Sequence, residues 1–399
     1  MNKPLANVRI LDLTHMLSGP YGSMILADLG AETIKVEPLQ GEGTRKLLAT
    51  DPKNSLDGFG AYYITLNRNK QSVAIDLKSP AGREVFYDLV RKSDVVISNF
   101  GVGVAERLGI DYATLSAINP AIVTCTVTGF GSDGPKPDRP AFDQVAQATG
   151  GGMSITGSDP AHPVRSGIPI GDLGGGMFAV MGILAALLER GGSGRGQHVD
   201  ISMLDCQVSM LNYMATMHFL SGEDPYPIGN SHFVHVPYNT FATSDGFIVI
   251  AVITDNFWQN LKQVIPCPEF ADTRYDTQPG RWQDRDMINE RLNAILKNNT
   301  SEYWLRQLEA KRIPCAPVNR FSQALGDSQV LHRNMVVELK HPGGKSTRGP
   351  GNPIKLSRTN EESFSAAPLV GQHTDEVLSR LLGYEAGAIE ELRRQGVVG

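Results

Sequence analysis

The side chain best placed for chemistry is Asp172, which precedes three consecutive glycines in PVRSGIPIGDLGGGMF, residues 163–178. An aspartate at such a place is ordinarily the N-cap of the following helix, and this structural role is the alternative to a catalytic one. A helix N-terminus also favours a carboxylate anion, so it would keep Asp172 ionised and available as a nucleophile. Gly174, Gly175 and Gly176 each cost about 1 kcal/mol of helix propensity. Because a purely structural helix has no reason to accept that cost three times, the triplet favours close approach of a bulky substrate to the carboxylate.

A second pattern resembles a dinucleotide-binding unit but is incomplete. Gly19 and Gly22 suggest a glycine turn between a strand and a helix, and the acidic Glu37 ends the next strand. The G-x-G-x-x-G spacing is missing, and Pro20 lacks the amide hydrogen that could contact a pyrophosphate. We therefore expect a Rossmann-like βαβ unit that does not bind a nicotinamide nucleotide.

Metal and serine-nucleophile chemistry have weaker support. His232 and His235 lie three residues apart in a Pro- and Asn-rich segment without a third ligand, so we interpret them as loop histidines and predict no metal site. No G-x-S-x-G elbow follows a strand. The four cysteines are scattered without a C-x-x-C pair, which is typical of reduced thiols in a cytoplasmic protein.

The composition is that of an ordinary globular chain, with 399 residues, 41% hydrophobic and 20% charged, and this length suggests about two domains. A net charge of -5 gives no broad attraction to polyanions, so neither nucleic acid nor an anionic membrane is an expected partner. The first residues enter a strand-like segment without an apolar signal region, and we expect a cytoplasmic protein.

The elements that must position Asp172 alternate between strands and helices. This alternation predicts an α/β fold with a parallel sheet. The predicted strands are 8–13, 33–37, 72–77, 95–98, 122–127 and 198–203. A helix is predicted from Asp172 to Arg190, and its apolar run 177–188 is too short to cross a membrane.

The chain composition changes after residue 220. Residues 222–237 are rich in Pro, Gly, His and Asn, which marks a connection out of the first domain. A smaller α+β region follows, with a hairpin of 240–243 and 247–252 and helices at 255–264, 286–297 and 301–311. A strand from about 336 and closing helices at 372–382 and 386–394 end the chain.

Motifs along nearly the whole chain resemble the class III CoA-transferase family. The resemblance is carried by PLANVRILDLTHMLSGPYGSMILADLGAETIKVE, NRNKQSVAIDLKSPAGREVFYDLVRKSDVVISNF, TGFGSDGP, AFDQVAQATGG, the GD-x-GG helix with SGRGQHVDISMLD, and APLVGQHTDEVL. It implies a Rossmann-like large domain plus a smaller α+β domain in an interlocked homodimer. The implied boundaries are 1–220 for the large domain, 221–335 for the small domain with its linkers, and 336–399 for a return to the large domain.

The same resemblance implies roles for individual residues. Asp172 would be the nucleophile that forms a mixed anhydride and then an aspartyl-CoA thioester, with acyl-CoA as a substrate and no tightly bound cofactor. Apart from the resemblance, Gly174 and Gly175 are candidates for contact with the acid substrate because they lack side chains next to Asp172. Arg165, seven residues before Asp172, is a candidate to bind the distal carboxylate of a dicarboxylic acid, and a surface arginine paired with a neighbouring acid is the alternative. Residues implied to contact CoA are His15, Met16, Leu17, Ser18, Ile75, Asp76, Leu77, Lys78, Asn99, Phe100, Gly101, Arg107, Pro140, Ala141, Phe142 and Asp143.

Departures from the family pattern bear on specificity. Leu17 stands where formyl-CoA transferase has a glutamine, and Pro38 replaces an arginine near the adenine, so the formyl and oxalate pair is not expected. We expect succinyl-CoA as the donor and mesaconate, itaconate, citramalate or a glutarate as the acceptor. A 2-methylacyl-CoA racemase is an alternative, but its histidine would fall on Phe142, which cannot carry a proton. A non-catalytic acyl-CoA-binding protein is the other alternative.

Overall fold

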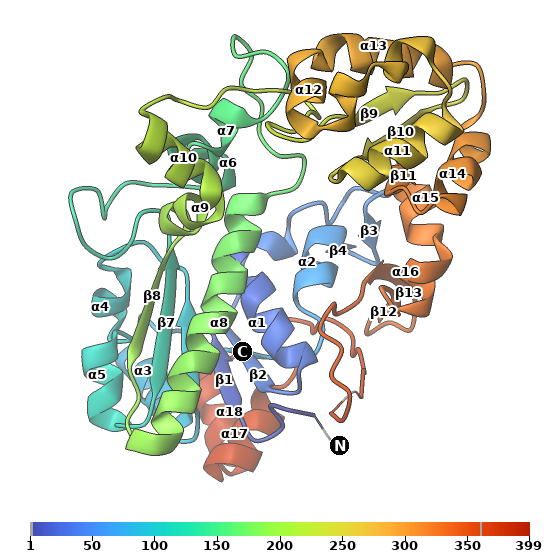
Figure 1. Ribbon diagram of the computed structural model, residues 1–399. Coiled ribbons are helices and arrows are strands. Elements are labelled where there is room, and N and C mark those ends of the chain that lie inside the picture. The colour runs from blue at the N-terminus through green and yellow to red at the C-terminus, as the bar shows by residue number, and fades with distance from the viewer. Residues whose placement is uncertain (1–2, 360) are drawn as a thin grey trace. The chain divides into compact units, whose positions relative to one another are not determined.

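The computed structural model describes residues 3–359 and 361–399, which pack as two compact units (Figure 1). The first unit comprises the chain up to Gly152, Arg165–Leu220 and Ser328–Gly399, and the second comprises Met153–Val164 and Ser221–Asp327. Relative to the boundaries expected from the sequence, residues 153–164 pack with the second unit and residues 328–335 with the first. Each unit is described by itself below.

The first unit contains a six-stranded parallel sheet, which confirms the predicted α/β class. The strand order is β5-β2-β1-β6-β7-β8, and all neighbouring pairs are parallel. Five of these strands are nearly continuous runs of buried residues, as expected for strands covered on both faces, whereas the edge strand β8 alternates between exposed and partly buried residues. The strands are β1 (Arg9–Asp12), β2 (Glu32–Glu37), β5 (Lys70–Ala74), β6 (Val95–Ser98), β7 (Val123–Thr128) and β8 (His198–Ser202).

Successive side chains of β1 point to opposite faces and enter different cores. Leu11 joins the core formed with Phe86 and Leu378, whereas Ile10 joins the core formed with Leu26 and Ile183. The helices that bring these and neighbouring residues to the two cores are α1 (Ser18–Asp28), α3 (Pro80–Val90), α5 (Tyr112–Ile118), α8 (Ile170–Ser193), α17 (Thr374–Leu382) and α18 (Ala386–Arg394). The sheet is therefore a two-sided scaffold, and α1 and α8 belong to the same side.

The remaining elements of the first unit are short. The predicted strand near residue 336 is confirmed, and it pairs with β13, a strand that the sequence did not predict. These elements are η1 (Gly43–Arg45), β3 (Ser55–Leu56), β4 (Phe59–Gly60), α2 (Ala61–Leu66), α4 (Val104–Leu108), α6 (Asp143–Thr149), α9 (Met203–Leu211), α10 (Tyr213–Ser221), α16 (Ser328–His332), β12 (Val336–Lys340) and β13 (Ser346–Pro350). The short helix α7 (Gly152–Ile155) starts at the boundary between the two units.

The second unit is a three-stranded antiparallel sheet covered by helices. The predicted hairpin is confirmed as β9 paired with β10, and β11 pairs on the other side of β10. The core contains Trp258, Phe241 and Leu292, and the buried Arg281 pairs with Asp255 at 2.8 Å. The elements are β9 (Tyr238–Ala242), β10 (Phe247–Ala251), α11 (Asp255–Val264), η2 (Pro268–Ala271), η3 (Thr273–Asp276), α12 (Gln278–Gln283), α13 (Arg285–Leu296), α14 (Ser301–Ala310), β11 (Cys315–Pro317) and α15 (Phe321–Gly326).

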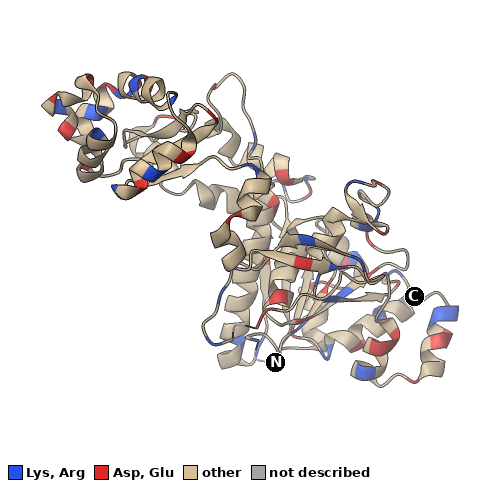
Figure 2. Cartoon of the chain, turned by 90° about the vertical axis from the view of Figure 1, so that its right-hand side faces the viewer, with Lys and Arg blue, Asp and Glu red and all other residues tan. Residues whose placement is uncertain are grey.

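Residues of both charge signs are interspersed along the ribbon of each unit (Figure 2). On α18, for example, Arg393 pairs with Glu390 at 2.8 Å and also contacts Asp375 on α17.

Helix α8, which carries Asp172, is longer than the sequence predicted. It spans 24 residues, and by length and composition alone it could cross a membrane, with a mean hydropathy of 1.7 over its most apolar window. Core helices of globular domains meet the same criterion, and Ala179 and Ile183 of α8 pack into the core with α1 and the sheet. Met181 and Leu188 are 52% and 82% exposed.

The homodimer implied by the resemblance stays a prediction, which light scattering can test against the chain mass of 43.2 kDa.

Glycines let α1 and α8 approach closely. A Cβ atom on Gly176 would lie 2.6 Å from the backbone oxygen of Ser18, and one on Gly22 would lie 2.9 Å from the backbone oxygen of Gly176. The sequence interpretation that a structural helix has no reason for the glycine triplet is therefore wrong, since the triplet has a packing role. The predicted glycine turn is also corrected, because Gly19 and Gly22 lie inside α1.

We predict that Gly176→Ala lowers the free energy of unfolding by about 1–3 kcal/mol, because the added methyl group overlaps backbone that cannot rotate away. Gly191→Ala is the matched control on the same helix, since nothing lies within 4 Å of its Cβ position. That control should stabilise the protein by about 0.5–1 kcal/mol through helix propensity. Urea unfolding of both variants measures the difference, and equal effects would contradict the close-contact role.

Candidate active site

Asp172 lies in the first turn of α8 and is not its N-cap. The helix begins at Ile170, and Pro169 at the N-cap position has no side-chain cap. Asp143 performs the capping instead, because its Oδ1 accepts hydrogen bonds from the amides of Gly171 at 2.8 Å and Asp172 at 3.3 Å. The structural role that the sequence assigned to Asp172 therefore belongs to Asp143, and α6 and α8 are tied together at this point.

The environment of Asp172 makes its carboxylate a stronger base than an exposed one. Burial, with a smaller contribution from repulsion by Asp143, raises the pKa of Asp172 from 3.8 to about 6. Loss of solvation thus opposes the charge that the helix N-terminus favours. At neutral pH the group is still mainly ionised. It combines anionic charge with raised basicity, and this combination suits a nucleophile.

Asp172 lines a cavity of about 310 Å³ within the first unit. Three loops that follow β1, β6 and β7 form most of its wall, as expected at the carboxyl ends of parallel strands. Phe142 is 64% exposed at this cavity. The residues implied by the resemblance that share the cavity with Asp172 are His15, Met16, Ser18, Asn99, Phe100, Gly101, Pro140, Ala141 and Phe142.

A second cavity, of about 510 Å³, shares His15, Met16 and Phe100 with the first. Its walls are largely apolar, and two cations, Lys78 and Arg107, lie among its lining residues. The other implied residues in it are Ile75, Asp76 and Leu77. Two adjoining cavities with cations in one and a nucleophile in the other suit a long ligand with a reactive end and an anionic end.

Five implied residues do not line either cavity. Leu17 is the N-cap of α1, and Asp143 caps α8. Gly174 and Gly175 are buried inside α8. Arg165 is exposed, and its guanidinium donates a hydrogen bond to the backbone oxygen of Ser166 at 3.1 Å.

The loop shared by the two cavities has a constrained backbone. The amide of His15 donates to Asn99 Oδ1 at 2.8 Å, and Asn99 Nδ2 donates back to the His15 oxygen at 2.7 Å. Met16 has a φ of 62°, a left-handed conformation that is costly for a residue with a long side chain. The ring centroids of His15 and Phe100 lie 5.6 Å apart. Burial lowers the pKa of His15, which favours the neutral imidazole.

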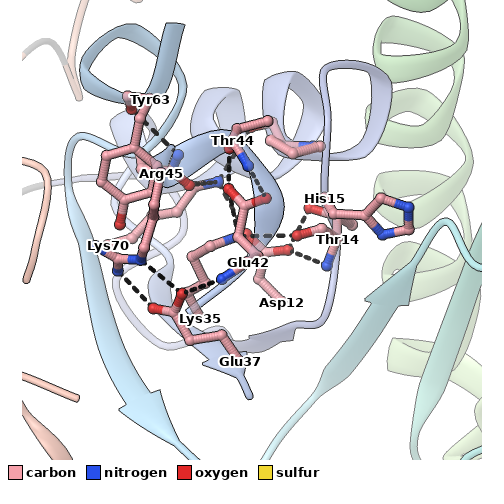
Figure 3. Close-up of polar contacts among 12 residues, drawn as sticks. Asp12, Thr14, His15, Lys35, Glu37, Glu42, Thr44, Arg45, Tyr63 and Lys70 are labelled. Atoms are coloured by element: carbon pink, nitrogen blue, oxygen red, sulfur yellow. Dashed lines mark hydrogen bonds and ion pairs between the residues drawn. The ribbon is translucent and has the colours of Figure 1, made fainter. Parts of the chain in front are cut away.

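A buried ion pair stabilises the residues directly before this loop (Figure 3). Lys70 Nζ lies 2.9 Å from Asp12 Oδ2, and both side chains are fully buried. Asp12 Oδ1 accepts hydrogen bonds from the amide and the hydroxyl of Thr14, while Lys35 Nζ donates to the Thr14 oxygen at 2.8 Å. Burial lowers the pKa of Lys70 to about 8; for Asp12, burial is outweighed by Lys70 and Lys35, which hold its pKa well below the usual range. The amide, the hydroxyl and the backbone oxygen of Thr14 are thus all held by hydrogen bonds, directly before the cavity loop.

Glu37, the acidic residue of the incomplete dinucleotide pattern, belongs to the same buried region. Arg45 holds it with two hydrogen bonds of 2.7 and 2.6 Å, and the Ser72 hydroxyl adds a third at 2.6 Å. Glu37 is therefore engaged in structural contacts.

The sequence analysis missed two residues near Asp172. Burial, followed by the negative charge of Asp172, raises the pKa of Tyr62 to about 12, so its phenol remains a hydrogen-bond donor. Arg139 lines the cavity of Asp172, and its guanidinium lies 5.4 Å from the ring centroid of Phe130. The one available signal for Arg139 was its place between the TGFGSDGP and AFDQVAQATGG motifs.

Comparisons with known proteins agree with this site. Residues 5–374 match the family described as CoA-transferase family III. A crystal structure of a CAIB/BAIF family protein from Brucella suis superposes with a TM-score of 0.85 at 32% identity, covering 96% of this chain and 100% of that one. The chain therefore belongs to CoA-transferase family III and is a class III CoA-transferase.

Two named relatives align over nearly their whole length. Succinyl-CoA:glutarate CoA-transferase of Mus musculus is 35% identical over 398 residues, which cover 99% of this chain and 90% of that protein. Succinyl-CoA:mesaconate CoA-transferase of Haloarcula hispanica is also 35% identical, over 94% of this chain and 95% of that protein.

We predict that Asp172→Asn stabilises the protein above pH 6 by about 1–3 kcal/mol. The folded pKa of about 6 exceeds the ordinary value of 3.8, so the folded state binds the proton more tightly than the unfolded state. The contribution of protonated Asp172 to the free energy of unfolding is therefore complete below about pH 4 and is lost as the pH rises through about 6. Thermal unfolding should show a gain for the variant at pH 7.5 and none at pH 4, and a loss at pH 7.5 would contradict the assigned environment.

Proposed function

We propose that this protein transfers CoA from succinyl-CoA to a small dicarboxylic acid through covalent intermediates on Asp172. The observation that carries the proposal is Asp172 itself, a partly buried carboxylate of raised pKa in a cavity that adjoins a second, cation-bearing cavity. Family membership sets the reaction class. The names of the two relatives supply the donor and the kind of acceptor.

The reaction would proceed by exchange of acyl bonds. A carboxylate oxygen of Asp172 attacks the thioester carbonyl, the C–S bond breaks, and CoA leaves as a thiolate from the mixed anhydride. The thiolate attacks Asp172 Cγ, succinate departs, and an aspartyl-CoA thioester remains. The acceptor carboxylate attacks the same carbon and expels the thiolate, which then attacks the acceptor carbonyl and restores the free carboxylate. Each step conserves one activated acyl bond, so no ATP is required.

The two cavities would divide CoA between them. Lys78 and Arg107 supply positive charge for its phosphates, which a chain of net charge -5 must provide locally. The apolar walls of the larger cavity suit the uncharged pantetheine arm. The shared residues His15 and Phe100 would then flank the passage of the thiol toward Asp172.

A dicarboxylic acceptor needs a cation for the carboxylate that does not react. Arg139 meets this need best, because it lines the cavity of Asp172 and its planar guanidinium binds carboxylates in a bidentate way. Arg165, favoured by the sequence analysis, is exposed and does not line that cavity. We therefore assign the distal carboxylate to Arg139.

The racemase alternative has one observation in its favour. Racemisation needs two bases, and Phe142 occupies the position where the sequence would place the second one. His15, a titratable group, lines the same cavity as Asp172 and could take that role. Burial favours neutral His15, and neutral imidazole can accept a proton. Transfer without deuterium uptake at the α-carbon in heavy water would separate the two activities.

We predict that protein incubated with succinyl-CoA acquires a CoA thioester on the peptide containing Asp172. The adduct should be cleaved by hydroxylamine and detected by mass spectrometry, and Asp172→Asn should form none and lose CoA exchange, because an amide is a poor nucleophile. The stability of that variant provides the folding control. Labelling of a cysteine, or full exchange by Asp172→Asn, would overturn the covalent mechanism.

We predict that Arg139→Gln raises the KM for dicarboxylic acceptors by roughly ten- to a hundredfold, as expected for the loss of a charge-assisted hydrogen bond. Arg165→Gln is the matched control and should leave this KM nearly unchanged. Assays with glutarate and mesaconate, and with a monocarboxylic acid for comparison, measure the effect. An equal effect of Arg139→Gln on monocarboxylic acids would instead indicate a contact with CoA.

A further inference from the structure

The hydroxyl group of Ser18 is buried without a hydrogen-bond partner among the residues that the structure describes. The whole residue is 3% exposed and occupies the first position of α1. Leaving a buried hydroxyl unpaired lowers stability, so most such groups in proteins have a partner. Ser18 therefore retains an unused hydrogen-bond donor at a stability cost.

This hydroxyl packs against Gly175, one helical turn after Asp172. A Cβ atom on Gly175 would lie 2.5 Å from Ser18 Oγ and 3.2 Å from side-chain atoms of Val127 and Met203. Ser18, Val127 and Met203 all line the cavity of Asp172. Because Gly175 follows Asp172 by three residues, both lie on the same face of α8.

Glycine at position 175 is what leaves room for the hydroxyl. Any larger residue there would occupy the place of Ser18 Oγ. The end of α1 adds a favourable field, since its first turn contains no acidic residue and its N-cap Leu17 has no side-chain cap. Negative charge that develops near this helix end is stabilised by the helix dipole.

We propose that Ser18 is a catalytic residue whose hydroxyl donates a hydrogen bond to the oxygen on Asp172 Cγ when that carbon becomes tetrahedral. The proposal rests on the proposed function. It names the side chain that would stabilise the negative charge developing on that oxygen. Ser18 and Asp172 line the same cavity of the first unit. The aspartyl oxygen is a reacting oxygen that belongs to the protein itself, so it is present in every turnover.

Two steps of the reaction create this tetrahedral centre. When the CoA thiolate attacks Asp172 Cγ, a C–S bond forms and the carbonyl electron pair moves to the aspartyl oxygen. The pair returns as the Cγ–O bond to succinate breaks. Attack by the acceptor carboxylate repeats the sequence with the C–S bond breaking. Ser18 keeps its proton throughout and contributes one hydrogen bond that is stronger to the anionic oxygen than to the carbonyl.

The test is Ser18→Ala, which removes the donor without adding volume. We expect kcat to fall about 100-fold, the size known for the loss of one such donor, with little change in the KM for succinyl-CoA. The free energy of unfolding should stay the same or rise, because the folded protein loses an unpaired group. Ser93→Ala is the control, since Ser93 is equally buried but donates to the Leu89 oxygen at 2.7 Å and lines neither cavity. It should lose stability and keep kcat.

A single-turnover experiment then separates the possible failures. The rate at which the CoA adduct appears on Asp172 should fall in Ser18→Ala by a factor similar to that for kcat. An unchanged rate, or a loss of kcat that follows a loss of stability, would overturn the role of Ser18. If the wild-type protein forms no adduct, the covalent mechanism itself fails.

Discussion

Close contact between α1 and α8 is the constraint on which the site depends. Gly22 and Gly176 bring the two backbones together, and Gly175 leaves space for the Ser18 hydroxyl. One helix carries Asp172 and the other begins at the loop that both cavities share. A change in the separation of the two helices would therefore alter the position of Asp172 and of its surroundings together.

Buried charges give the cavity loop a second support. Lys70 and Asp12 form an ion pair in the interior, and Lys35 joins it by holding the Thr14 oxygen. Such pairs contribute little net stability, because desolvation offsets most of their attraction, but they penalise any arrangement that separates the charges. Their effect here is to fix one backbone conformation directly before His15 and Met16. A hydrophobic core alone would leave that polar backbone less well determined.

Unfavourable features concentrate around one cavity. Met16 has a left-handed backbone, Asp172 is partly buried with a raised pKa, and the Ser18 hydroxyl is unpaired. Each of these lowers stability in the free protein, and such costs are typically concentrated at functional sites. The surrounding sheet and helices provide the stability against which these costs are balanced.

The sequence determined the secondary structure of the scaffold and singled out Asp172, because strand alternation and the GD-x-GG pattern are local signals. Through the family motifs it also predicted several of the residues that line each cavity. Tertiary structure decided which carboxylate caps α8, since Asp143 reaches Gly171 from a different helix. It likewise decided the packing role of the glycines and the place of Arg139 beside Asp172. These features depend on contacts between segments distant in the chain, which no local pattern encodes.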